Sequence, residues 1–146
     1  MRHHAIRNFT LLSLLLIVTA GTVSAQSTRN RIDIPFNFTV GQHSLPAGTY
    51  TVEPLKRDSR NVWMLQNKAG NVNILFITIP VWNGKTQGDT RLVFNKYEGR
   101  NFLAQIWSAG ESSGRELLRT KWERQVAKNG VQPEQVAVIS ESRLKR

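Results

Sequence analysis

The chain has 146 residues, 20 Lys and Arg, 10 Asp and Glu, 4 Trp and no Cys, and its formal net charge is +10. The length fits one domain, and the lack of cysteine excludes disulfides, a thiol nucleophile, Cys-based zinc sites and iron–sulfur clusters. Hydrophobic residues at 40% against 21% charged indicate a folded globular domain rather than a disordered chain.

The first 25 residues have the pattern of a secretory signal peptide. Arg2 and Arg7 give a positive start, and residues 11–18 are apolar apart from one serine. This apolar run is far shorter than the roughly 20 residues that cross a bilayer, and the small residues of Val23–Ala25 follow it as a cleavage site. We therefore expect residues 26–146 to form a single β-rich domain in the periplasm or outside the cell, without a membrane-spanning segment.

Alternating apolar and polar side chains predict strands in the first two thirds of this domain. Residues 32–40 alternate with period 2, and Pro35 within them favours an edge strand or a bulge. Further strands are predicted at residues 49–55, 62–66, 72–79, 91–96 and 102–107. The run Leu75–Ile77 is apolar on both faces, which is typical of a central strand, and Pro80 is expected to end that strand.

The pattern changes after residue 110. Ser113 and Glu116 have the spacing of a capping box. Three apolar residues then recur every fourth position as a narrow helical stripe: Leu118, Trp122 and Val126. We expect a helix that ends at Asn129–Gly130. The competing interpretation makes residues 115–122 a strand that pairs with residues 102–107.

The end of the chain adds little to this architecture. Residues 135–140 fit a last short strand, and residues 143–146 form a basic tail that is expected to fray. Together the elements predict a mainly β fold, an antiparallel β-sandwich or small barrel of about six to seven strands with a short C-terminal helix. Nothing in the sequence decides whether the sheet closes into a barrel.

The tryptophans separate into predicted core residues and one candidate contact residue. Trp63 and Trp107 lie in predicted strands and Trp122 lies on the helical stripe, so all three are expected in the core. Trp82 follows a proline and precedes Asn83-Gly84 at the end of a strand. An exposed ring there predicts a ligand contact, such as a stacking platform for a sugar.

Basic residues supply the other candidate contacts. Lys56, Arg57 and Arg60 cluster in one predicted loop, where they would attract anionic envelope polymers in a salt-dependent way. Three further cations would share one helix face: Lys121, Arg124 and Lys128. The competing interpretation is a solubility surface, because basic residues are spread through most loops. We do not expect specific nucleic-acid binding.

Catalytic and metal-binding patterns are not found in the sequence. His43 is the one histidine after residue 25, and its neighbour Ser44 would point to the opposite face of an extended segment. Three glutamates could serve as an acid–base pair for glycoside hydrolysis, but nothing selects between them: Glu53, Glu98 and Glu111. We therefore expect a non-enzymatic binding or structural domain without a cofactor. The alternatives are a small-ligand carrier barrel and a hydrolase of envelope polymers.

Four short segments carry a resemblance to known proteins. They are Pro35–Gly41, Leu45–Val52, Phe102–Trp107 and Gly114–Leu117. Together they resemble an uncharacterised family of small exported bacterial β-domain proteins. The resemblance implies a signal peptide and a β-rich domain, and it supplies no catalytic or binding residues.

Export can be tested by the start of the processed protein. We expect protein recovered from the periplasm or medium of bacterial cells to begin at Gln26, because signal peptidases cut after a small residue. N-terminal sequencing and the intact mass measure this. A precursor that stays inside cells with residues 1–25 attached contradicts the prediction.

Overall fold

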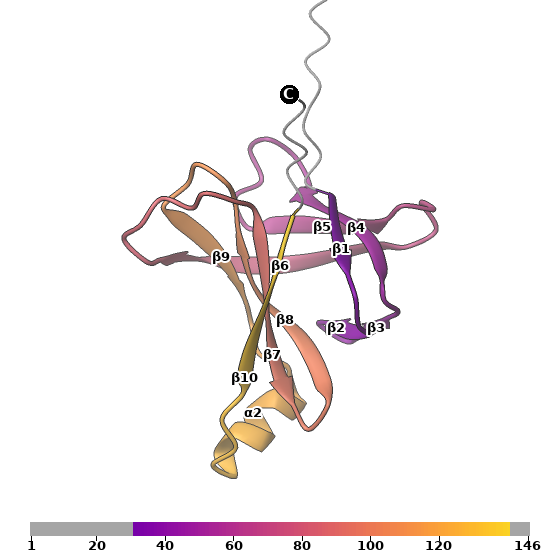
Figure 1. The fold of residues 1–146 in the computed structure, drawn as a ribbon, viewed down its shortest axis with the longest axis vertical. Helices are drawn as coiled ribbons and strands as arrows, with labels where there is room; N and C mark the ends of the chain where they lie inside the picture. Colours follow the sequence, from indigo (N-terminus) through magenta and orange to yellow (C-terminus); the bar gives the residue numbers. More distant parts are fainter. Residues whose placement is uncertain (1–30, 141–146) are drawn as a thin grey trace, which may run out of the picture.

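A computed structural model of the chain describes residues 31–140 (Figure 1). This part is mainly β with one short helix near its C-terminal end, as the sequence predicts. The strands are β1 (Arg31–Ile34), β2 (Phe38–Val40), β3 (His43–Leu45), β4 (Gly48–Pro54), β5 (Val62–Asn67), β6 (Asn73–Trp82), β7 (Arg91–Tyr97), β8 (Arg100–Trp107), β9 (Ser113–Leu117) and β10 (Glu134–Ile139), and the helix is α2 (Lys121–Lys128). The predicted signal peptide and the basic tail lie outside the described residues.

Strands β1, β4, β5 and the first part of β6 form the first half of the sheet, in that order and antiparallel throughout. The expected strand over residues 32–40 is interrupted, so that β1 and β2 are separate strands. Pro35 lies in the gap between them. It has no N–H, and at this position none is needed for a hydrogen bond between strands. Residues 31–140 contain ten strands where six or seven were expected, because residues 32–40 form two strands and because β3 and β9 are additional.

Strand β6 joins the two halves of the sheet. Its residues from Asn73 to Ile77 pair with β5, and those from Thr78 to Trp82 pair with β9. The prediction that Pro80 ends this strand is wrong, because the strand continues through Pro80 beside a new partner. In Figure 1 β5 and β6 run across β7, β8 and β10, so the two halves face each other.

The second half of the sheet is built around β8. Strand β7 pairs with β8 along its whole length, with an irregularity between Val93 and Phe94, and β10 pairs with β7. The other edge of β8 is shared by β9 and, in parallel, by β2 of the β2–β3 hairpin. The sheet is not closed into a barrel. Across the open seam the Ser140 hydroxyl donates a hydrogen bond of 2.9 Å to the Arg31 carbonyl.

The space between the halves is filled by apolar side chains. Phe38 lies at its centre and makes edge-to-face contacts with Tyr50 and Phe94, at ring-centre distances of 5.1 and 5.5 Å. The other buried members of this core are Ile32, Ile34, Val40, Leu45, Val52, Trp63, Leu65, Ile74, Phe76, Leu92, Leu103, Ile106 and Leu117. With no cysteine in the chain, this packing supplies the stability of the fold.

The helix begins later than the sequence suggested. The capping box predicted at Ser113 and Glu116 is wrong, because both residues lie in strand β9. The alternative of a strand over residues 115–122 is correct for residues 115–117, which belong to β9, and β9 pairs with β8 as that alternative expected. The capping box is instead formed by Thr120 and Glu123, each of which accepts a hydrogen bond from the other's backbone N–H. Leu118, expected on the helical stripe, precedes the helix and is 64% exposed.

Two predictions about buried side chains have different outcomes. Trp63 and Trp107 are buried as expected, and Trp122 is half-buried. Strand β6, however, is buried on only one face. The prediction of a central strand is correct, because β6 lies between β5 and β9 in the order of the sheet, but Leu75 and Ile77 on its outer face are exposed by 56% and 64%. The apolar run marks a strand whose outer face carries no other layer within the described residues.

Gly114 provides a test of the packing between β8 and β9. A Cβ at this position would lie 2.7 Å from the Trp107 ring, which is itself buried. We expect Gly114→Ala to lower the free energy of unfolding by about 1–3 kcal/mol, since the ring cannot move without disturbing its neighbours. Urea unfolding measures the change. Gly88→Ala is the matched control, because nothing lies within 4 Å of its Cβ, and equal stabilities of the two variants would contradict the prediction.

Candidate functional site

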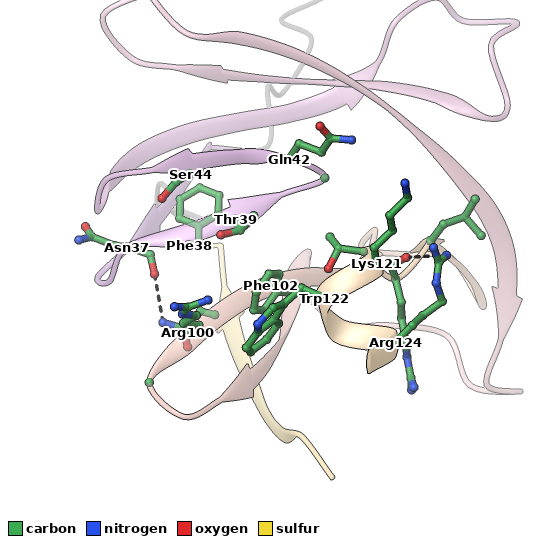
Figure 2. Close-up of a pocket in the computed structure, with 16 residues that line it drawn as sticks. Asn37, Phe38, Thr39, Gln42, Ser44, Arg100, Phe102, Lys121, Trp122 and Arg124 are labelled. Atoms are coloured by element: carbon green, nitrogen blue, oxygen red, sulfur yellow. Dashed lines mark hydrogen bonds between the residues drawn. The ribbon is translucent and has the colours of Figure 1, made fainter. Parts of the chain in front are cut away.

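A groove of about 970 Å³ lies between the β2–β3 hairpin and the start of α2 (Figure 2). Its floor is the beginning of β8, and the β7–β8 turn closes one end. The lining residues are Asn37, Phe38, Thr39, Gly41, Gln42, Ser44, Gly99, Arg100, Asn101, Phe102, Leu118, Arg119, Thr120, Lys121, Trp122 and Arg124. Four of them are cations and none is a carboxylate, so the groove is suited to an anionic ligand.

Three aromatic rings fix the helix beside the sheet. The Trp122 ring stacks on Phe102 with ring centres 5.1 Å apart and an interplanar angle of 19°. Tyr97 meets both rings edge-on, at 6.1 Å from Phe102 and 5.8 Å from Trp122. Such aromatic contacts have a defined geometry. The position of α2, and of the cations at its start, is therefore set by this cluster.

The cations are held by contacts with the protein. The Arg100 guanidinium lies 5.0 Å from the centre of the Trp122 ring, within cation–π range. Arg124 donates a hydrogen bond of 3.2 Å to the Arg119 carbonyl, and in Figure 2 the Lys121 side chain extends from α2 toward the hairpin. Two of the charges are already oriented. The binding of an anion here therefore costs the protein less side-chain entropy than binding to free lysines would.

The opposite wall of the groove is polar. Gly41 forms the tight turn of the β2–β3 hairpin with a φ of +60°, a conformation that favours glycine. The Asn101 amide donates a hydrogen bond of 3.1 Å to the Asn37 carbonyl and ties the hairpin to β8. Thr39, Gln42 and Ser44 complete this wall. Their hydroxyl and amide groups can bond to the hydroxyls of a carbohydrate.

The acidic residue closest in sequence to the cations belongs to the capping of the helix. Glu123 is buried and its carboxylate accepts a hydrogen bond of 2.8 Å from the Thr120 N–H. A carboxylate in the first turn also interacts favourably with the helix dipole. Glu123 therefore serves the helix start and does not line the groove.

The residues predicted as ligand contacts are not brought together. Lys56, Arg57 and Arg60 are exposed in the loop between β4 and β5 and line neither the groove nor the cleft at Trp82. Trp82 is 71% exposed, as expected, and lies in a separate cleft at the end of β6. The two groups of predicted contacts do not share a pocket, and ligand contact by either of them stays a prediction.

Sequence reasoning missed two of the four cations of the groove and its polar wall. Arg100 and Arg119 were not identified, whereas Lys121 and Arg124 were noted only as part of a basic helix face. The signal available in the sequence is the run Lys121–Arg124, in which two cations flank a tryptophan. No local pattern in the sequence predicts that the β7–β8 turn lies against this run. The two segments meet because aromatic rings that are far apart in the chain pack together.

Comparisons with protein-family profiles, curated proteins and solved structures gave no significant match. Residues 31–140 hold no cluster of three or more His, Asp or Glu side chains that could bind a metal ion. No helix within this range has the length and apolar character needed to cross a membrane.

The buried tyrosines give a test of the cluster under the groove. Burial raises the pKa of both Tyr50 and Tyr97 above the ordinary value of 10.0, and at Tyr97 the charge of Arg119 opposes this shift while Glu123 adds to it. These two are the only tyrosines of the chain. We expect less tyrosinate absorbance near pH 10 from the native protein than from the protein unfolded in guanidinium, which titrates at about 10.

The same shifts determine how stability depends on pH. Well below pH 10 both phenols are neutral in the folded and unfolded states, so their contribution to stability is complete there. Above pH 10 the tyrosines of the unfolded chain ionise first. The free energy of unfolding then falls as the pH rises through the raised pKa values of the folded protein. A native tyrosinate step at the ordinary pKa would show that one of the two phenols is solvated.

Proposed function

We propose that the protein is an exported, non-enzymatic binding domain of the cell envelope or exterior, and that the groove holds a segment of an anionic polysaccharide. The observation that carries this proposal is the set of four cations without a carboxylate among the residues that line the groove. Opposite these charges the hairpin offers hydroxyl and amide groups, so both the acidic groups and the hydroxyls of such a polymer find partners.

The state of the aromatic rings favours a polysaccharide over a single-stranded nucleic acid. Proteins that bind single strands leave aromatic faces free for the bases to stack on. Here Trp122 is already stacked on Phe102 and covered by the Arg100 guanidinium. The rings support the cations instead of offering a stacking surface, and charge is the main feature that the groove recognises.

The filled interior supports a surface-binding role over a carrier role. A carrier barrel needs an apolar cavity between its sheets, and in this protein Phe38, Phe94 and the surrounding aliphatic side chains occupy that space. A hydrolase would need two carboxyl groups facing a bound sugar. The groove lining contains none.

Export is supported by the N-terminal pattern. A positive start, a short apolar run and small residues before Gln26 are the features of a cleaved leader. An exported protein meets anionic polymers such as acidic exopolysaccharide. A net positive charge then raises its rate of association with them.

A matched pair of triple variants tests the groove. In the first, Arg119→Gln, Lys121→Gln and Arg124→Gln are combined; in the second, Lys56→Gln, Arg57→Gln and Arg60→Gln. Both remove the same charge from exposed positions. We expect the groove variant of the full chain to bind a fluorescent oligogalacturonate about tenfold or more weakly and with a shallower salt dependence. The loop variant should stay close to the unmodified protein. Fluorescence anisotropy over a salt series measures both.

The controls separate site binding from general attraction. Methyl-esterified oligogalacturonate has the same sugars without the charge and is expected to bind at least tenfold more weakly. Equal losses in the two triple variants would show that affinity follows total charge, and the proposal would fail. Tighter binding of a single-stranded oligonucleotide than of oligogalacturonate would assign the groove to nucleic acid instead.

A further inference from the structure

A second cleft, of about 470 Å³, lies at the far end of β8 from the basic groove. It is formed where the end of β6 meets β7, β8 and β10. The lining residues are Val81, Trp82, Asn83, Arg91, Val93, Gln105, Trp107, Gln135 and Ala137. Its composition differs from that of the groove, because it holds two indole rings, three amide side chains and a single cation. Different chemistry at the two ends of one strand indicates different ligands.

The floor of this cleft is a fixed indole ring. Trp107 is 4% exposed, and its ring lies against Gly114, where a Cβ would come too close to the ring. The ring nitrogen donates a hydrogen bond of 3.1 Å to the Gln105 amide oxygen. Since both contacts fix the ring, its orientation does not have to be ordered when a ligand binds.

The rim of the cleft is an exposed indole ring. Trp82 is the most exposed of the large apolar side chains at 71%, and it follows directly on Val81 at the end of β6. An exposed tryptophan beside a cleft with polar walls is typical of a binding site, because the ring provides a large contact area with few rotatable bonds. The fold itself gains little from burying this ring.

The polar groups of the cleft are suited to hydroxyls. Asn83, Gln105 and Gln135 bring amide groups that both donate and accept hydrogen bonds. The Arg91 guanidinium lies 5.7 Å from the centre of the Trp107 ring, and its Nε is buried without a hydrogen-bond partner within the described residues. The lining contains no carboxylate. This set of donors and acceptors fits a ligand that has many oxygen atoms and carries no positive charge.

We propose that this cleft is a carbohydrate subsite that binds one neutral pyranose ring. The C–H groups on one face of such a ring form an apolar surface that stacks on indole, and its equatorial hydroxyls point outward to the amides and to Arg91. Trp82 supplies the stacking surface and Trp107 the fixed floor. The inference does not rest on the basic groove, since it uses none of the residues that line it.

Saturation-transfer NMR with the full chain tests this subsite. The probes are cellotetraose and chitotetraose, whose sugars carry equatorial hydroxyls, and a galactose-based tetrasaccharide with an axial hydroxyl. We expect millimolar binding of at least one of the first two. Trp82→Ala is expected to weaken it about tenfold, and Trp82→Phe, which keeps an aromatic face, about threefold or less. The control Ile77→Ala removes an equally exposed apolar side chain of the same strand outside the cleft and should change nothing.

The outcomes separate this inference from the proposed function. Trp82→Ala should keep the melting temperature of the unmodified protein, because its ring is exposed, so a loss of binding is not a loss of folding. No transfer to any of the three probes, or equal binding by the Ala variant, overturns the carbohydrate subsite. Neither result affects oligogalacturonate binding in the groove. Loss of neutral-sugar binding in the Arg119, Lys121 and Arg124 triple variant would also overturn the inference, because it would place the sugar in the groove.

Discussion

Strand β6 couples the two halves of the molecule, because it is hydrogen-bonded to β5 along its first part and to β9 along its second. Thr78 marks the change of partner. It is fully buried, and both its N–H and its hydroxyl donate to the Asn61 carbonyl, at 2.8 and 3.3 Å. A buried polar residue that satisfies its hydrogen bonds at this position fixes the place where the strand changes partner. The facing of the two sheet halves, and so the core that they enclose, depends on this junction.

In both the groove and the cleft, an arginine is oriented by an indole ring. At one end of β8 the Trp122 ring supports the Arg100 guanidinium, and at the other end the Trp107 ring lies near Arg91. In both places an aromatic ring limits the motion of an arginine: Trp122 is stacked on Phe102 of β8, and Trp107 is the last residue of β8 itself. A guanidinium that is oriented in this way keeps its hydrogen-bonding geometry and loses less entropy on binding. Strand β8 therefore organises both ends of the binding surface.

The local sequence predicted most strands and the class of fold, but not the features that build the sites. Three segments have the Ser/Thr-x-x-Glu pattern of a capping box, and they start at Ser108, Ser113 and Thr120. Only the Thr120 segment caps a helix. In the Ser113 segment Gly114 lies under the Trp107 ring, and its strand pairs with β6 and β8. Such long-range pairing overrides a local signal. Exposure of Trp82 could be predicted from the turn residues beside it, whereas the place of Arg100 in the groove could not, since it follows from ring packing between distant segments.

The bond from the Ser140 hydroxyl to the Arg31 carbonyl brings the two ends of the described fold together. Figure 1 shows this meeting point at the end of the molecule away from α2. Two edge strands of the sheet, β1 and β10, which would otherwise be open to pairing with other chains, lie beside each other there. Anchoring the protein to a bead or a sensor chip through position 31 or 140 would therefore leave the helix end, with its arginines and lysine, directed toward the surrounding solution.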